Sequence, residues 1–128
     1  SVWINLLKAH EPTLKRMKQI IAKGDVLVIN EVVAMELLAG KRMTDNHEVD
    51  RIVNNTPSLA LDANIDFRKA GNLFAQMRKR GVTVRNTSDC LIAVNAMNHE
   101  NVVLLHSDND YVQIAEHTSL KHEVISVQ

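Results

Sequence analysis

Residues 102–111 read VVLLHSDNDY, a short continuous apolar run followed by a turn that holds two aspartates. The run Val102–Leu105 predicts a strand, and Tyr111–Glu116 has the spacing of a short helix after the turn. An earlier run, Val26–Ile29, is also continuous and partly β-branched, so it predicts a strand buried on both faces. Strands of this kind, alternating with helices, indicate an α/β fold with a largely parallel sheet.

Helix signals fill the segments between these runs, with Pro12, Asn30 and Gly40 at predicted helix ends. The predicted helices are Ser1–Lys8, Thr13–Lys23, Glu31–Ala39, Asp45–Val53, a long helix from an Asp62 or Asn64 cap to about Arg80, and one from Thr87 or Ser88 to Met97, with a weak strand at Leu59–Leu61 and a final strand at Val124–Val127. The sequence shows no repeats or linkers, so we expect one domain over residues 1–128. Folds of this class usually open with a strand, whereas this chain opens on a helix.

The composition is that of an ordinary globular domain of 128 residues. Fifteen basic and fifteen acidic residues cancel, so net charge gives no long-range attraction to a polyanion. The single cysteine, Cys90, excludes an internal disulfide framework and suits a reducing compartment. No apolar stretch approaches the ~20 residues of a membrane span, and there is no basic-then-apolar leader. We therefore expect a soluble, cytoplasmic domain.

Four acidic residues stand beside apolar segments, where a carboxylate is costly unless it is paired or bound to a metal. Asp108 and Asp110 follow the strand Val102–Leu105, so both could face one ion, or one could cap the next helix. Asp89 falls in the first turn of its helix, where a capping role alone would explain it. Glu36 borders the apolar side of its helix, and a solvated position explains it equally well. Converging carboxylates are the ligands of a hard divalent cation, so together the four favour phosphodiester chemistry.

The order and spacing of these phrases resemble the PIN-domain ribonucleases, and within them the VapC-type toxins of bacterial toxin–antitoxin pairs. The matching phrases cover nearly the whole chain and are Ser1–Leu7, Ala34–Gly40, Thr83–Ala93, Leu104–Tyr111 and Ile114–Leu120. The first of them looks like the segment that follows the family's opening Asp-x-Ser motif, and the last follows the pattern of one subgroup. This resemblance implies a three-layer α/β/α fold with a mainly parallel sheet.

The resemblance also implies roles for the acids. Glu36, Asp89 and Asp108 match the family's second, third and fourth acids, which are catalytic, and Asp110 matches a frequent accessory. With the first acid, they would hold one or two Mg²⁺ or Mn²⁺ ions. The metal would activate a water and neutralise charge on the scissile phosphate of RNA. The implied activity is a metal-dependent endoribonuclease, the toxin of a type II toxin–antitoxin module.

Partners and contacts follow from the same resemblance. It implies an RNA substrate, with tRNA as one candidate, a VapB-type antitoxin, and a second copy in a homodimer. Ser1, Ser107 and Arg85 are candidate contacts to a phosphate or another ligand, although helix capping explains Ser1 as well.

One departure concerns the family's first acid, which should lie two positions before Ser1. It should end a central strand between Val26–Ile29 and Val102–Leu105, and the sequence contains neither the acid nor the strand. We therefore expect that the sequence begins inside its domain. This leaves an alternative function open, a catalytically impaired PIN-like scaffold that binds a partner protein. A phosphoacceptor receiver domain is disfavoured, because no lysine follows a late strand as that site requires.

Other polar and reactive residues favour structural interpretations. The basic run Arg78–Arg80 complements the C-terminus of the long helix better than it indicates a dedicated RNA contact. Cys90 beside two aliphatic residues indicates a buried apolar filler rather than a nucleophile. His106 lacks a partner at the spacing of a zinc site, and Trp3 suits the core.

Overall fold

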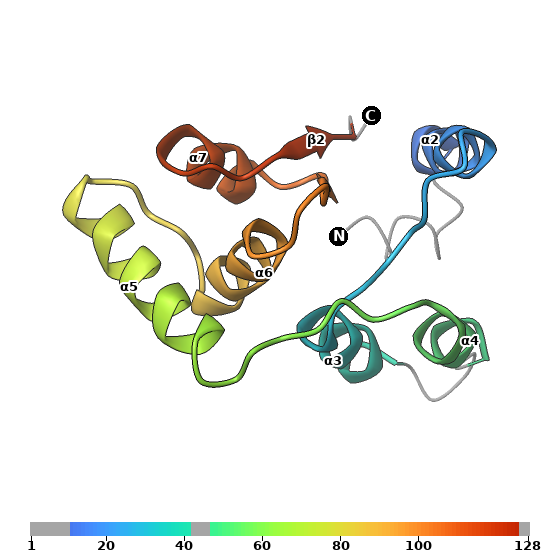
Figure 1. Ribbon diagram of the computed structural model, residues 1–128, viewed down its shortest axis with the longest axis horizontal. Helices are drawn as coiled ribbons and strands as arrows, with labels where there is room; N and C mark the ends of the chain where they lie inside the picture. The colour runs from blue at the N-terminus through green and yellow to red at the C-terminus, as the bar shows by residue number, and fades with distance from the viewer. Residues whose placement is uncertain (1–10, 42–46, 126–128) are drawn as a thin grey trace. The chain divides into compact units, whose positions relative to one another are not determined.

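The computed structural model describes residues 11–41 and 47–125. The predicted helix Ser1–Lys8 lies outside this range, as do the first residues of Asp45–Val53 and the end of Val124–Val127. Figure 1 shows the elements, which are α2 (Glu11–Ala22), α3 (Glu31–Ala39), α4 (His47–Asn55), α5 (Asp66–Lys79), α6 (Thr87–Met97), β1 (Leu104–His106), α7 (Asn109–His117) and β2 (His122–Val124). None of the described helices combines the length and the apolar character that crossing a membrane requires.

The chain divides into two compact units, residues 1–59 with 125–128, and residues 60–124. In the first unit, α3 packs on α4 and buries its apolar side. Its bounds are those predicted, because the signals at both ends are local. The Asn30 side chain accepts a hydrogen bond from the backbone N–H of Val33 at 2.9 Å, and the backbone N–H of Gly40 closes the last turn.

The predicted strand Val26–Ile29 is wrong as a buried strand. Only Ile29 pairs, in an isolated parallel bridge to Ser58, and Val26 is 71% exposed. Two backbone hydrogen bonds form this bridge: the N–H of Ile29 donates to the carbonyl of Pro57, and the N–H of Leu59 donates to the carbonyl of Ile29. The weak strand predicted at Leu59–Leu61 is therefore also reduced to the bridge at Ser58. An apolar run does not by itself supply the partner backbone that a strand needs.

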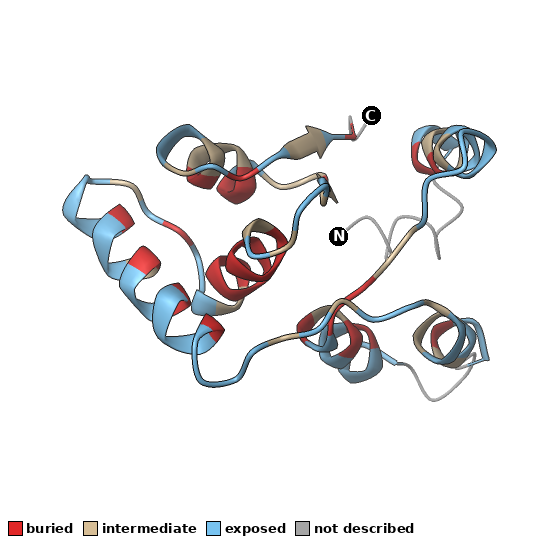
Figure 2. Ribbon diagram, in the orientation of Figure 1, coloured by how far each residue is buried: buried red, intermediate tan, exposed pale blue. Residues whose placement is uncertain are grey.

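The second unit contains α6, which is buried along most of its length. Residues 89–96 of α6 are all buried, as Figure 2 shows, and α5 packs on this helix through Ala70, Leu73 and Met77. The spacing of those three residues places them on one face of α5, as the sequence predicts. Burial of this stretch fixes the position of the side chains in the first turn of α6.

In the described part of the chain, β1 and β2 form a two-stranded parallel sheet, and α7 makes the connection between them. Leu104 pairs with His122 and His106 with Val124. The strand predicted at Val102–Leu105 is therefore present but shifted toward His106, and the final strand begins earlier than predicted. The turn that follows β1 leads directly into α7, and this turn carries the two aspartates.

Candidate active site

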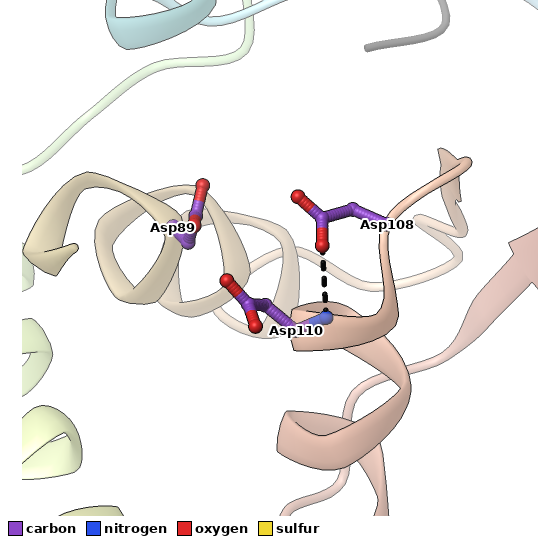
Figure 3. A group of neighbouring side chains, drawn as sticks. All are labelled: Asp89, Asp108 and Asp110. Carbon is purple, nitrogen blue, oxygen red and sulfur yellow. Dashed lines mark hydrogen bonds between the residues drawn. The ribbon is translucent and has the colours of Figure 1, made fainter. Parts of the chain in front are cut away.

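Three of the predicted acids meet in the second unit. Asp89 lies in the first turn of α6, Asp108 is the N-cap of α7, and Asp110 lies in the first turn of α7. One carboxylate oxygen from each of them lies within 4.8 Å of the others. Figure 3 shows the three side chains at the adjoining N-terminal ends of the two helices. Helix N-termini favour negative groups, so each carboxylate gains from the dipole beside it.

Asp108 both caps α7 and belongs to the acidic cluster, so its role as a helix cap is compatible with its predicted role as a metal ligand. Its Oδ1 accepts a hydrogen bond from the backbone N–H of Asp110 at 2.9 Å. Its own backbone N–H donates to Nδ1 of His106 at 3.2 Å, which ties the turn to the end of β1. The capping geometry therefore holds the Asp108 carboxylate over the start of α7.

Asp89 is held from two sides. The side-chain oxygen of Asn86, the N-cap of α6, accepts the backbone N–H of Asp89 at 3.2 Å. The Tyr111 hydroxyl donates to Asp89 Oδ1 at 3.2 Å, although the two residues are 22 positions apart. Asp89 is 9% exposed, so its position in the cluster is set by packing and by the tyrosine. Sequence reasoning missed Tyr111, and its place directly after Asp110 was the available signal.

Arg85 contacts two of the three carboxylates. Its Nη2 lies 2.5 Å from Asp108 Oδ2 and its Nε lies 3.1 Å from Asp110 Oδ2. The backbone N–H of Arg85 also donates to Asp110 Oδ2, at 3.2 Å. The hydrogen bond to Asp110 and the charges of both aspartates raise the pKa of the Arg85 guanidinium. Arg85 thus neutralises part of the cluster's charge, whereas the contact to a phosphate stays a prediction.

A pair of histidines, one buried and one half-buried, supports the turn that carries Asp108. His106 is 2% exposed, and its Nε2 lies 2.8 Å from Nδ1 of His122 on the neighbouring strand. Burial, then the charge of His122, lowers the pKa of His106 to about 4. A neutral His106 can accept the Asp108 backbone N–H, so its role is to position the turn. Nothing in the sequence pointed to His122, because their pairing depends on the register of two parallel strands.

The remaining predicted residues lie as follows. Glu36 is on α3 in the first unit, with an exposed side chain, and its place among the ligands stays a prediction. Ser107 is half-buried in the turn before Asp108, and Ser1 lies outside the described residues. Cys90 is fully buried, which confirms the interpretation as a filler, and burial raises the pKa of its thiol to about 11.

The chemistry of this donor set fits a divalent cation. Carboxylate oxygens are the ligands that Mg²⁺ uses in proteins, and Mg²⁺ needs only a few of them because it keeps several waters. Asp89, Asp108 and Asp110 supply three carboxylates within reach of one ion. Their charges repel one another without a cation, and Arg85 offsets only part of that repulsion.

Comparison with known proteins identifies the family. A family model of the PIN domain matches residues 1–117. The chain is 41% identical over 92 residues to VapC ribonuclease Mb1587 of Mycobacterium bovis and to ribonuclease VapC11 of Mycobacterium tuberculosis, which covers 71% of this chain and 68% of each relative.

A solved structure agrees with the fold. The crystal structure of VapBC2 from Rickettsia felis bound to a DNA fragment from their promoter matches with a TM-score of 0.74. The match covers 95% of this chain and 91% of that chain, at 20% sequence identity. The predicted α/β fold class with a parallel sheet is confirmed, and the chain belongs to the PIN-domain family.

Proposed function

We propose that this protein is a metal-dependent endoribonuclease that hydrolyses RNA phosphodiester bonds as the toxin of a type II toxin–antitoxin module. One observation carries the proposal: in a PIN-domain chain, Asp89, Asp108 and Asp110 come from two helices to within 4.8 Å of one another. The relatives that are named as VapC ribonucleases support the choice of RNA as substrate.

In this proposal Asp89, Asp108 and Asp110 hold Mg²⁺ or Mn²⁺, and Glu36 is a further ligand. The bound ion supplies an activated water and neutralises charge on the scissile phosphate. The chain's own groups orient the ligands: the Tyr111 hydroxyl holds Asp89, and the cap of α7 holds Asp108. Ser107, Arg85 and Ser1 are the candidate contacts to the phosphate.

The proposed partners are an RNA, with tRNA as one candidate, a VapB-type antitoxin, and a second copy of the chain. The VapBC2 structure with the same fold is itself a complex, which supports an antitoxin partner. The first unit also exposes large apolar side chains that a partner would cover, namely Ile21, Val26, Met35 and Leu38. An RNA substrate would place the activity in the cytoplasm.

The test is cleavage of RNA by the purified protein with Mn²⁺ or Mg²⁺, with and without EDTA. Asp108→Asn is the most informative variant, because asparagine caps a helix as well as aspartate does, while the negative charge and with it the ion pair to Arg85 are lost. We expect this variant to lose at least about 100-fold of the cleavage rate. Asp25→Asn, at an exposed position, is the matched control and should cleave like the wild type.

Two results would contradict the proposal: full cleavage by Asp108→Asn, or cleavage that EDTA leaves unchanged. Binding of an antitoxin by a wild-type protein that cleaves no RNA would instead favour the alternative, a PIN-like scaffold.

A further inference from the structure

Arg85 bridges Asp108 and Asp110 with one guanidinium. The two contacts use different nitrogens, Nη2 for Asp108 and Nε for Asp110, and in each case the acceptor is the Oδ2 atom. The backbone N–H of Arg85 donates to the same Oδ2 of Asp110. Arg85 comes from the loop before α6, 23 and 25 positions from its two partners, so the fold itself brings the three together.

The arginine side chain is much more exposed to solvent than the two aspartates that it contacts. The Arg85 side chain is 70% exposed, whereas those of Asp108 and Asp110 are 29% and 10% exposed. The backbone N–H of Asp110 holds the Asp108 carboxylate at the start of α7, and the backbone N–H of Arg85 holds that of Asp110, whereas the arginine side chain lies largely at the surface. An exposed guanidinium on two less exposed carboxylates is a contact that another cation can replace.

A divalent ion and Arg85 would compete for the same atoms. Asp108 Oδ1 accepts the Asp110 backbone N–H and Asp108 Oδ2 accepts Arg85 Nη2, so an ion that binds Oδ2 meets the guanidinium there. Two cations held at one pair of carboxylates repel each other strongly at contact distance. Metal binding at these Oδ2 atoms therefore competes with the Arg85 contacts.

We propose that Arg85 is a built-in counter-cation, which a divalent ion must displace from Asp108 and Asp110 when it binds the cluster. In the metal-free protein Arg85 offsets the repulsion among the acids, and in doing so it weakens the affinity for metal. Displacement leaves a guanidinium beside the ion, where it suits the oxygens of a phosphate. The inference rests on the proposed function only in naming that ion as the metal of the nuclease site.

The experiment measures Mn²⁺ affinity without RNA, by titration followed through the electron paramagnetic resonance signal of free Mn²⁺. We expect Arg85→Gln to bind Mn²⁺ on the order of fivefold more tightly than the wild type. Arg85→Lys should fall between them, because an ammonium cannot bridge both carboxylates as a guanidinium does. Arg68→Gln, an exposed change on α5 that removes the same charge, should bind like the wild type.

Thermal unfolding in EDTA checks the same variants and shows that they fold. Arg85→Gln should melt below the wild type without metal and gain more from Mn²⁺. Unchanged or weaker Mn²⁺ binding by Arg85→Gln, or an equal gain in Arg68→Gln, would overturn the inference. If Arg85→Gln does not fold, Arg85→Lys replaces it: tighter Mn²⁺ binding than in the wild type supports the inference, and unchanged or weaker binding overturns it.

The affinity readout separates this inference from the proposed function. Tighter Mn²⁺ binding by Arg85→Gln in a protein that cleaves no RNA would keep the inference and refute the nuclease. Mn²⁺-dependent RNA cleavage by the wild type, together with an unchanged Mn²⁺ affinity in Arg85→Gln, would keep the nuclease and refute the inference.

Discussion

Asp89→Asn is the substitution for which the structure allows the effect on stability and on metal binding to be worked out together. Asparagine keeps an oxygen that can accept the Tyr111 hydroxyl, and it keeps the backbone N–H that Asn86 caps. The change removes one negative charge from the cluster and keeps both of these hydrogen bonds. We expect a more stable metal-free protein and a loss of both Mn²⁺ binding and RNA cleavage.

The gain in stability follows from the distances within the cluster. At 4.8 Å, two unit charges repel by about 1 kcal/mol in water and about 3.5 kcal/mol at an effective dielectric constant of about 20. Arg85 cancels part of this repulsion, and loss of a charge from the first turn of α6 costs about 0.5 kcal/mol. A net gain of about 1 kcal/mol remains, which should raise the melting temperature by roughly 3–5 °C.

Metal reverses the order of stabilities. At a Mn²⁺ concentration 100 times its dissociation constant, the wild type gains about 2.7 kcal/mol from binding. Asp89→Asn should gain much less, because it has lost a ligand. Thermal unfolding of both proteins in EDTA and in Mn²⁺, with Asp25→Asn as the exposed control, measures the two effects.

The reasoning fails if Asp89→Asn melts below the wild type in EDTA, or if Mn²⁺ raises the melting temperatures of both proteins equally. Wild-type cleavage of RNA by Asp89→Asn would refute the place of this residue in the site.

Two further predictions concern buried groups. Because burial raises the pKa of the Cys90 thiol to about 11, iodoacetamide at pH 9 should modify the native protein at least about 100-fold more slowly than the unfolded protein; equal rates would show that the thiol is accessible. The pKa of His106 falls from 6.5 to about 4 on folding, so the unfolded state takes up a proton first as the pH drops. Stability should be intact above pH 6.5 and fall by about 2 kcal/mol toward pH 5. Denaturant unfolding of metal-free wild type and His106→Gln measures this, and equal losses in both would contradict it.

The sequence predicted those helix ends and site residues whose positions depend on neighbouring residues in the chain. The bounds of α3 follow from Asn30 and Gly40, which lie next to the helix that they end. The start of α6 at Thr87 and the place of Asp89 in its first turn follow from the same kind of signal. Asp108 and Asp110 could be placed after a strand because an apolar run directly precedes them.

Contacts between distant segments could not be predicted. Val26–Ile29 has the composition of a buried strand, but pairing needs a partner backbone, and in the described residues only Ile29 finds one. The contacts of Arg85 depend on how its loop packs against α7, and the histidine pair depends on the register of β1 and β2. These are properties of the folded unit, which the spacing of residues along the chain does not reveal.

The central claim is that Asp89, Asp108 and Asp110 bind one divalent ion. Anomalous diffraction from crystals of the protein grown with Mn²⁺ tests it most directly, because manganese scatters anomalously much more strongly at its absorption edge than the lighter atoms of the protein do. The account predicts a peak at coordinating distance from carboxylate oxygens of all three aspartates, with the Arg85 guanidinium moved off Asp108. A map without a peak there, or with manganese bound only elsewhere, would contradict it.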